Sequence, residues 1–231
     1  MANEIFNRIE KKYVLNKQKF DNLMILIQEY MNHDKFYKST ICNIYFDTDD
    51  YELIRTSIEK PIYKEKLRLR SYNTPNIDDE VFFEIKKKYN SVVNKRRITL
   101  SLKDYYSYLN HETIPEENTQ IGKEITYMIK HYDLKPKVFL AYDRKAYIGK
   151  NDKNLRITID TNIRSRNDDL YLEHGDMGEL LNKEQYYLME IKSFNGYPKW
   201  LVNCLSDNNI YPQNFSKYGN VYKKNDERRN N

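Results

Sequence analysis

Polar and apolar side chains alternate in two segments near the middle of the chain, residues 66–70 and 81–88. Successive side chains of an extended strand point to opposite faces, so Arg68 and Arg70 share one face and the leucines beside them share the other. The second segment has the same parity, with valine, phenylalanine and isoleucine on one face and Glu84 and Lys86 on the other. The pattern predicts two strands, each with an apolar and a charged face, joined by a turn-rich span.

Strand-like alternation and helical spacing of apolar residues recur along the rest of the chain. Further strands are predicted over residues 5–15, 40–47, 92–100, 137–148, 155–160 and 186–193. Helices are predicted over residues 16–31, 101–109 and 119–132 and after Pro198, with Asn16 and Ser101 as caps for the first two. Residues 51–59 form either a short helix or an irregular turn, and residues 167–185 are expected to form a loop.

These elements predict an α+β fold that is built on an antiparallel sheet of about eight strands. Strands that follow one another in a mostly meandering order favour antiparallel pairing. No internal repeat or linker separates the elements, so a single domain over residues 1–224 is the economical interpretation. Residues 225–231 are then a disordered polar tail.

Composition favours a folded chain with an unusually polar interior. Charged residues make up 32% of the chain and hydrophobic residues 39%, but 22 Tyr and 9 Phe argue against disorder. Cys42 and Cys204 are too few for a disulfide framework or a zinc site, which indicates a reduced, cytoplasmic setting. No segment reaches the roughly 20 apolar residues of a membrane span. Membrane association would therefore require a membrane-protein partner.

Cations gather on the charged faces of the predicted strands, together with single carboxylates. The set comprises Lys12, Arg68, Arg70, Lys86, Lys95, Arg97, Arg144, Arg156 and Lys192, with Glu10, Glu84, Asp160 and Glu190. Like charges directly across a strand pair are destabilising, so a polyanion that neutralises the cations would account for the pattern. Two arrangements stay open: the charged faces line a lumen or groove, or they face solvent around an ordinary core.

The side chains on these faces suit phosphate and a divalent metal ion. Arg binds phosphate oxygens through two parallel N–H donors, Lys acts as a point charge, and Tyr142 adds a hydroxyl donor. Glutamates can bind Mg²⁺ or Mn²⁺, which often bridge protein carboxylates and substrate phosphates. Asp47, Asp49 and Asp50 also resemble a metal cluster, but a turn explains them better.

Seven short motifs together closely resemble one known family, the VTC domain, which is the polyphosphate polymerase domain of the vacuolar transporter chaperone complex. The motifs are IYFDTDDYEL at 44–53, LRLR at 67–70, FFEIKKK at 82–88, YDRKAY at 142–147, LRITID at 155–160, LMEIKS at 188–193 and FSKYG at 215–219. The resemblance covers residues 6–223. It implies the fold of the triphosphate tunnel metalloenzyme, or CYTH-like, superfamily: a closed antiparallel β-barrel with a polar basic lumen, covered outside by several helices.

The resemblance also implies roles for individual residues. It assigns phosphate binding to Lys12, Arg68, Arg70, Lys86, Lys95, Arg144, Arg156 and Lys217, with Tyr142 and Ser216 assisting. Glu190 would be the principal metal ligand and would act in catalysis with Arg68, Arg70 and Lys86. Lys192 as a substrate contact, and Glu10 and Glu84 as further metal ligands, match the family's tunnel lining less closely. The first strand reads R-x-E-x-K, where the hydrolytic branch has E-x-E-x-K, and this difference fits the polymerase branch.

The implied activity is a phosphotransferase that moves the γ-phosphate of ATP onto a growing polyphosphate chain, with Mn²⁺ or Mg²⁺ as cofactor. Two alternatives stay open. One is a triphosphatase that acts on inorganic or nucleoside triphosphates in the same tunnel, and the other is a non-catalytic domain that binds polyphosphate or inositol phosphate. ATP and polyphosphate are the expected partners, whereas nucleic acid and direct membrane insertion are not expected.

Overall fold

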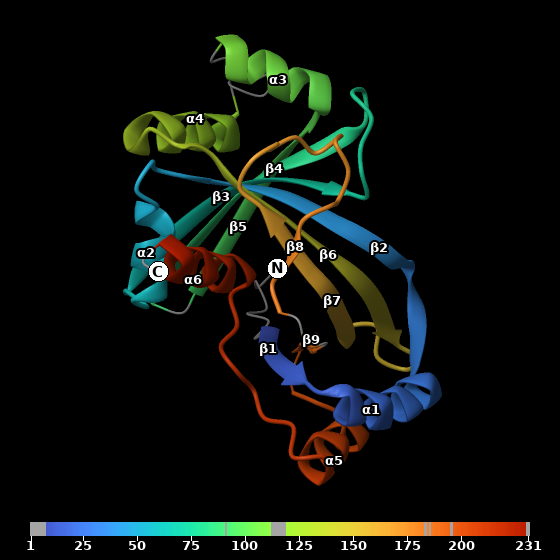
Figure 1. The fold of residues 1–231 in the computed structure, drawn as a ribbon. Helices are drawn as coiled ribbons and strands as arrows, with labels where there is room; N and C mark the ends of the chain where they lie inside the picture. The colour runs from blue at the N-terminus through green and yellow to red at the C-terminus, as the bar shows by residue number, and fades with distance from the viewer. Residues whose placement is uncertain are drawn as a thin grey trace. The chain divides into compact units, whose positions relative to one another are not determined.

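Strands and helices account for most of the chain in a computed structural model, which describes residues 8–90, 92–111, 119–182, 184, 186–194 and 196–229 (Figure 1). The strands are β1 (Arg8–Leu15), β2 (Met31–Asp47), β3 (Tyr63–Tyr72), β4 (Glu80–Tyr89), β5 (Val92–Ser101), β6 (Lys135–Gly149), β7 (Arg156–Arg166), β8 (Glu179–Leu180) and β9 (Tyr187–Phe194). The helices are α1 (Lys17–Tyr30), α2 (Glu52–Ile58), α3 (Leu102–His111), α4 (Gln120–Tyr132), α5 (Lys199–Asp207) and α6 (Lys217–Arg229). Among these helices, none is long and apolar enough to cross a membrane.

The nine strands belong to one sheet. Its order is β1-β9-β7-β6-β2-β3-β4-β5, with the short β8 paired to β7. The pairs β1–β9, β7–β9, β7–β8, β2–β3, β3–β4 and β4–β5 all run antiparallel. The predicted α+β class and antiparallel sheet are confirmed, whereas the strand order is that of an open sheet with β1 and β5 at its ends. The closed barrel stays a prediction.

The chain divides into two compact units. The first unit comprises Met1–Ser39, Tyr142–Ile163 and Asn182–Ser216, and the second comprises Thr40–Ala141, Arg164–Leu181 and Lys217–Asn231. Because β2, β6 and β7 each contribute residues to both units, the chain passes between the units several times. A single domain over residues 1–224 stays a prediction, and each unit is described by itself.

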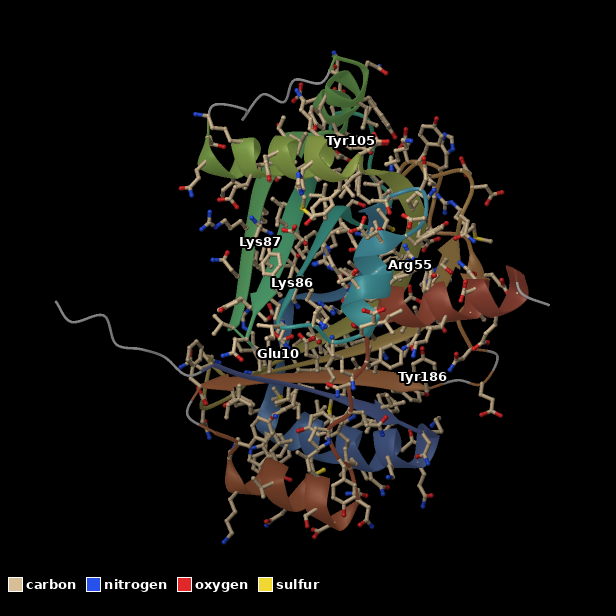
Figure 2. All side chains as sticks on the ribbon, turned by 90° about the vertical axis from the view of Figure 1, so that its left-hand side faces the viewer. Glu10, Arg55, Lys86, Lys87, Tyr105 and Tyr186 are labelled. Atoms are coloured by element: carbon tan, nitrogen blue, oxygen red, sulfur yellow. The ribbon has the colours of Figure 1, made fainter. Side chains whose placement is uncertain are left out.

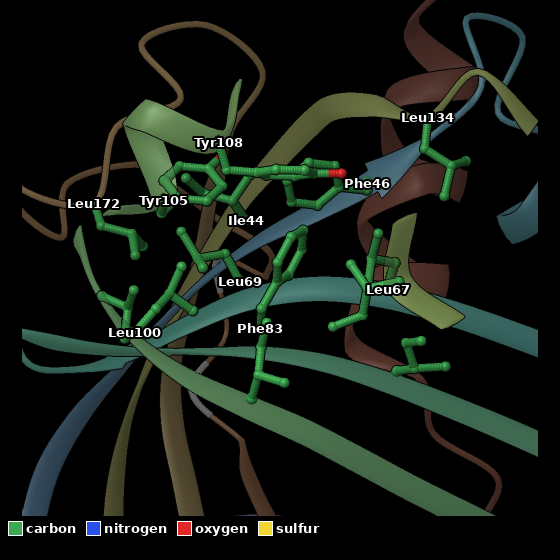
Figure 3. Close-up of a cluster of buried hydrophobic side chains, with 14 of the residues drawn as sticks. Ile44, Phe46, Leu67, Leu69, Phe83, Leu100, Tyr105, Tyr108, Leu134 and Leu172 are labelled. Atoms are coloured by element: carbon green, nitrogen blue, oxygen red, sulfur yellow. The ribbon is translucent and has the colours of Figure 1, made fainter. Parts of the chain in front are cut away.

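The apolar faces of β3, β4 and β5 form the core of the second unit (Figure 3). Leu67, Leu69 and Phe83 are all 0% exposed, as the alternation along β3 and β4 predicts. The ring of Phe83 meets Tyr105 of α3 edge to face, with 5.9 Å between the ring centroids. Full burial of such a side chain contributes about 2 kcal/mol. The helices α3 and α4 therefore cover the face of these strands that is opposite to Arg68, Arg70 and Glu84.

The first unit has a core of its own, in which α1 and α5 pack on β1, β7 and β9. Leu23 and Ile27, four residues apart on α1, supply its buried stripe. Asn16 caps this helix, as predicted, because its side-chain oxygen accepts a hydrogen bond from the backbone N–H of Lys19 at 2.9 Å. Apolar side chains from β1, β7 and β9 enter the same cluster, so the charged residues between them lie on the opposite face of the strands.

Several elements differ from the sequence-based expectation. The strand β2 begins at Met31, nine residues before the predicted start at residue 40, and α6 extends over residues 225–229, for which the sequence predicts a disordered tail. The two-residue β8 lies inside the predicted loop over residues 167–185. Residues 5–7 of the first predicted strand and residues 230–231 of the tail lie outside the described residues.

Candidate functional site

In the second unit, one face of β3, β4 and β5 carries a dense group of cations. The register sets Lys66 directly across from Lys86, and Lys86 directly across from Lys95. We call these three residues the lysine row. Like charges in directly opposed positions on neighbouring strands cost stability, unless an anion lies among them. The lysine row is therefore a concentration of positive charge on this face.

A buried carboxylate lies beside the lysine row. Glu84 is 1% exposed, and its Oε2 accepts a hydrogen bond from Arg68 Nε at 2.8 Å. Its other oxygen, Oε1, lies 2.7 Å from Lys95 Nζ, and Arg70 Nη1 lies 3.7 Å from Oε2. Burial raises the pKa of Glu84, but Arg68, Arg70 and Lys95 outweigh this effect and lower the pKa to about 2. Glu84 is thus a fixed negative charge that orients three cations.

The ammonium group of Lys95 has a pKa below the ordinary value of a lysine. Burial lowers the pKa of Lys95, and the opposing attraction of Glu84 offsets this only in part. Arg70 and Arg68 lower it further, so the pKa of Lys95 falls to about 8. Lys95 therefore carries its positive charge at neutral pH and loses it in mildly alkaline solution.

Two residues of β2 support this face although the predicted site does not include them. Asn43 is fully buried; its Oδ1 accepts a hydrogen bond from Arg70 Nε at 2.9 Å, while its Nδ2 donates to the carbonyl of Leu140 at 3.0 Å. Tyr45 accepts a hydrogen bond from Arg68 Nη1 at 3.2 Å. A signal for both was present in the sequence, because they alternate with apolar residues in the predicted strand over residues 40–47.

The first unit also gathers its charged residues on one strand face. Lys12 of β1 pairs with Glu190 of β9, and Glu190 pairs with Thr158 of β7. Two residues further along, Glu10 pairs with Lys192, and Lys192 pairs with Arg156. Positive and negative side chains therefore alternate along this face, in contrast to the uniform lysine row of the second unit.

Glu190 is the central carboxylate of the first unit. It is 13% exposed, and its Oε1 lies 2.5 Å from Lys192 Nζ. Burial raises the pKa of Glu190, but Lys192, Lys12 and Arg144 together lower it to about 2. Lys12 Nζ also donates a hydrogen bond to the carbonyl of Phe215 at 3.1 Å. Glu190 is consequently ionised at neutral pH, as a metal ligand must be.

Arg144 of β6 is held by a second buried carboxylate of the first unit. Its Nε and Nη2 donate to the two oxygens of Asp160 at 2.7 and 2.8 Å, a parallel pair of hydrogen bonds. The guanidinium also lies 5.2 Å from the ring centroid of Tyr142. Burial lowers the pKa of Arg144, but Tyr142, Asp160 and Glu190 raise it overall, so the charge is permanent.

Glu10 and Glu190 are the carboxylates that a divalent metal ion could use in the first unit. They are diagonal neighbours on β1 and β9, and Lys192 Nζ lies within 4.0 Å of both. Among the described residues, no group of three or more His, Cys, Asp or Glu could hold a metal ion. Mg²⁺ commonly binds through one or two carboxylates together with substrate phosphates, so the two glutamates fit a metal whose coordination phosphate completes. Glu84 belongs to the second unit and is already engaged by three cations.

The predicted site residues therefore form two groups. The second unit contains Arg68, Arg70, Glu84, Lys86, Lys95 and Lys217, and the first contains Glu10, Lys12, Tyr142, Arg144, Arg156, Glu190, Lys192 and Ser216. Lys217 is the first residue of α6, and Ser216 is exposed immediately before it. The register aligns the strand residues within each group.

The three aspartates at the end of β2 and directly after it have structural partners, as the turn interpretation predicts. Asp47 accepts hydrogen bonds from the backbone N–H groups of Leu53 and Ile54 at 2.8 and 3.1 Å, and so caps the first turn of α2. Asp49 pairs with two lysines of β6, and Asp50 pairs with an arginine of α2.

The antiparallel sheet with covering helices places the chain in the α+β class, and solved structures share this fold. A Bacillus halodurans protein described as a "putative adenylate cyclase" aligns with a TM-score of 0.54 and 16% identity, covering 90% of this chain and 93% of its own. A Vibrio parahaemolyticus protein described in the same words aligns with a TM-score of 0.51 and 11% identity, covering 93% of this chain and 97% of its own. At such low identity these likenesses concern the fold alone.

The VTC domain family model matches residues 7–225, and the chain belongs to this family. The subunit 4 of the vacuolar transporter chaperone complex from Trypanosoma brucei brucei is 28% identical over 165 residues, or 59% of this chain and 21% of the relative. The subunit 4 from Trypanosoma cruzi is 24% identical over 220 residues, or 75% of this chain and 27% of the relative. The chain thus spans about a fifth to a quarter of the length of these curated relatives. The family resemblance drawn from the motifs is confirmed.

Proposed function

We propose that this chain is a polyphosphate polymerase domain, which transfers the γ-phosphate of ATP to the end of an inorganic polyphosphate chain. The observation that carries the proposal is the lysine row, because three lysines in directly opposed positions on neighbouring strands favour the binding of a polyanion. Membership of the VTC domain family supports the same function. The proposal includes the closed tunnel with a basic lumen that the family resemblance implies.

The cations of the second unit would bind the phosphate chain. Arg68 and Arg70 are held in fixed orientations by Glu84 and Asn43, so they lose little side-chain entropy when phosphate binds. Lys86 is exposed and adds positive charge at the centre of the lysine row. Lys95 and Lys217 would extend this phosphate contact.

In the first unit, Glu10 and Glu190 would hold Mg²⁺ or Mn²⁺, which neutralises phosphate oxygens when bound. Lys12, Arg144, Arg156 and Lys192 would bind the phosphates, with Tyr142 and Ser216 as hydroxyl donors. A terminal oxygen of the acceptor chain attacks the γ-phosphorus, a new P–O bond forms, and the bond to the bridging oxygen breaks as ADP leaves. Such a reaction depends on positioning and charge neutralisation and requires no protein nucleophile.

The test is incubation of the purified chain with ATP and either MnCl₂ or MgCl₂, with and without a short polyphosphate primer. Chain growth is followed by gel electrophoresis and by ³¹P NMR. We expect Lys86→Ala to lower the rate of chain growth at least tenfold, because it removes the middle charge of the lysine row. Lys87→Ala is the matched control, since Lys87 follows Lys86 on β4 (Figure 2). Its side chain points to the opposite face of the strand and pairs with Glu124 of α4. Lys87→Ala should stay within about twofold of the native rate.

The products separate the proposal from its alternatives. Release of orthophosphate without chain growth would replace the polymerase with a triphosphatase. Tight binding of polyphosphate with no turnover under either metal would indicate a binding domain. The proposal also includes a cytoplasmic setting and a membrane-protein partner. The relatives are named as a subunit of a vacuolar transporter chaperone complex, and this name supports a partner protein.

A further inference from the structure

The guanidinium group of Arg68 is fixed from two sides. Its Nε and Nη2 contact Glu84 Oε2 at 2.8 and 2.7 Å. Its Nη1, on the other edge of the fork, donates to the Tyr45 hydroxyl at 3.2 Å. An arginine held in this way presents its remaining N–H donors in one direction, whereas an arginine paired only to Glu84 could still rotate about its last bonds.

Tyr45 is itself held in place by a second tyrosine. Its ring stacks on Tyr218 of α6, with 4.5 Å between the ring centroids and an interplanar angle of 19°. Both rings are buried, at 7% and 2% exposure. Lys66 Nζ lies 5.9 Å from the centroid of the Tyr218 ring, so the stack lies beside the cations of this face.

A buried carboxylate anchors the far side of the stack. Tyr218 donates its hydroxyl to Asp47 Oδ2 at 2.9 Å, and Asp47 is 0% exposed. Burial and the negative charge of Asp47 raise the pKa of Tyr218, so the hydroxyl keeps its proton and remains the donor. Asp47 also accepts hydrogen bonds from the backbone N–H of Thr48 and from the N–H groups of Leu53 and Ile54 in the first turn of α2, which gives the anchor a rigid base.

We propose that Tyr45 is a positioning residue for the anion site: its hydroxyl fixes Arg68, and Tyr218 and Asp47 fix its ring. The inference rests on the proposed function, because it assigns Tyr45 to the same phosphate-binding surface.

Positive charge surrounds Tyr45 on this face. Burial raises the pKa of its phenol, but Arg68, Arg70 and Lys66 outweigh burial and lower the pKa to about 8.

The test is a double-mutant cycle between Tyr45→Phe and Arg68→Lys, with tripolyphosphate as the probe and isothermal titration calorimetry as the measurement, without added metal. Tyr45→Phe keeps the stacked ring and removes only the hydroxyl. We expect it to weaken tripolyphosphate binding roughly fivefold in the native background and to have no further effect in the Arg68→Lys background. Tyr106→Phe is the matched control, because it also removes one tyrosine hydroxyl. The Tyr106 hydroxyl donates to Glu173 at 2.7 Å, and the Tyr106 ring packs against the apolar cluster of the second unit. The affinity of Tyr106→Phe for tripolyphosphate should equal that of the native protein.

Equal effects of Tyr45→Phe in both backgrounds, or no effect in either, would overturn the inference. A second readout covers the case in which the native chain does not bind tripolyphosphate, which would count against the proposed function itself. Hydrogen exchange at the Arg68 Nε–H group, followed by NMR, should be slower in the native protein than in Tyr45→Phe. If the two exchange rates are equal, Tyr45 does not position Arg68, whatever the ligand of this surface is.

Discussion

Lys95 carries a charge that depends on pH close to the physiological range. Because its pKa is lowered to about 8, the side chain is protonated at pH 7 and mostly neutral at pH 9. Loss of this charge removes one attraction to a phosphate chain, so binding should weaken as the pH rises. Between pH 7 and pH 9, we expect the affinity for tripolyphosphate to fall by up to about tenfold relative to Lys95→Arg, which stays charged.

The comparison with Lys95→Arg removes two other effects of pH, because they occur in both proteins. One is the titration of tripolyphosphate, and the other is that of Tyr45, whose pKa is also lowered to about 8. Calorimetric titrations of both proteins at several pH values provide the measurement. Parallel pH profiles for the two proteins would show that Lys95 does not titrate in this range.

The direction of Arg68 and Arg70 could be predicted from the sequence, because alternation within one strand assigns each residue to a face. The contacts of Glu84 could not. They depend on the register of three strands and on the reach of the Lys95 side chain across β4 and β5. Asn43 and Tyr45 had the right parity as well, but parity alone does not show that a polar residue supports an arginine.

At the scale of elements, a single arginine organises the segment after β7. Arg166 donates to the backbone carbonyls of Asp169, Tyr171, Gly175 and Met177 at distances between 2.6 and 3.1 Å. Its guanidinium also lies 3.6 Å from the centroid of the Phe139 ring. The segment carries Leu172, which is 0% exposed in the apolar cluster of the second unit. Arg166 therefore ties this loop to the core.

Replacement of Arg166 by lysine should loosen the loop. Lysine keeps the charge but cannot satisfy four carbonyls with a planar fork, so several carbonyls would lose their donor. We expect a loss of about 2 kcal/mol in the free energy of unfolding and faster hydrogen–deuterium exchange over residues 169–177. Arg228→Lys is the control, because Arg228 is 57% exposed in a surface ion pair with Glu179. Unchanged exchange in Arg166→Lys would contradict the assigned role.

Sequence patterns predicted the elements that bury a regular apolar face and missed those stabilised by distant partners. The first half of β2 is polar and lacks strict alternation, so its strand form depends on its neighbours in the sheet. The helix α6 has little apolar character, yet Tyr218 and Val221 are buried and Arg228 pairs with Glu179 of β8. These contacts join residues far apart in the chain, and local periodicity contains no information about them.

At the scale of the whole molecule, each unit contains a buried glutamate whose ionisation favours the folded state. The pKa of Glu84 in the second unit and that of Glu190 in the first are lowered from an ordinary value of 4.5 to about 2. The folded protein therefore binds fewer protons than the unfolded chain between these values. The stabilisation is complete above about pH 4.5 and is lost as the pH falls towards about 2.

We expect acid to destabilise both units over this interval, which urea unfolding at a series of pH values would measure. The slope of the unfolding free energy against pH should be steep between pH 4.5 and pH 2. Asp21→Asn should leave the profile unchanged, because Asp21 is 51% exposed in a pair with Lys17 on α1. A flat profile across this interval would show that the two buried glutamates do not stabilise the folded state.

The hydrogen bond between Tyr218 and Asp47 joins residues that are 171 positions apart, and this separation bears on biosynthesis. A ribosome completes Asp47, the start of α2 and most of the second unit long before it reaches Tyr218. Until then, Asp47 lacks its phenol donor, and the ring of Tyr45 lacks its stacking partner. The nascent second unit should consequently mature only after the ribosome has passed residue 218, and a chain that stops before this residue should be a preferred target of cellular proteases.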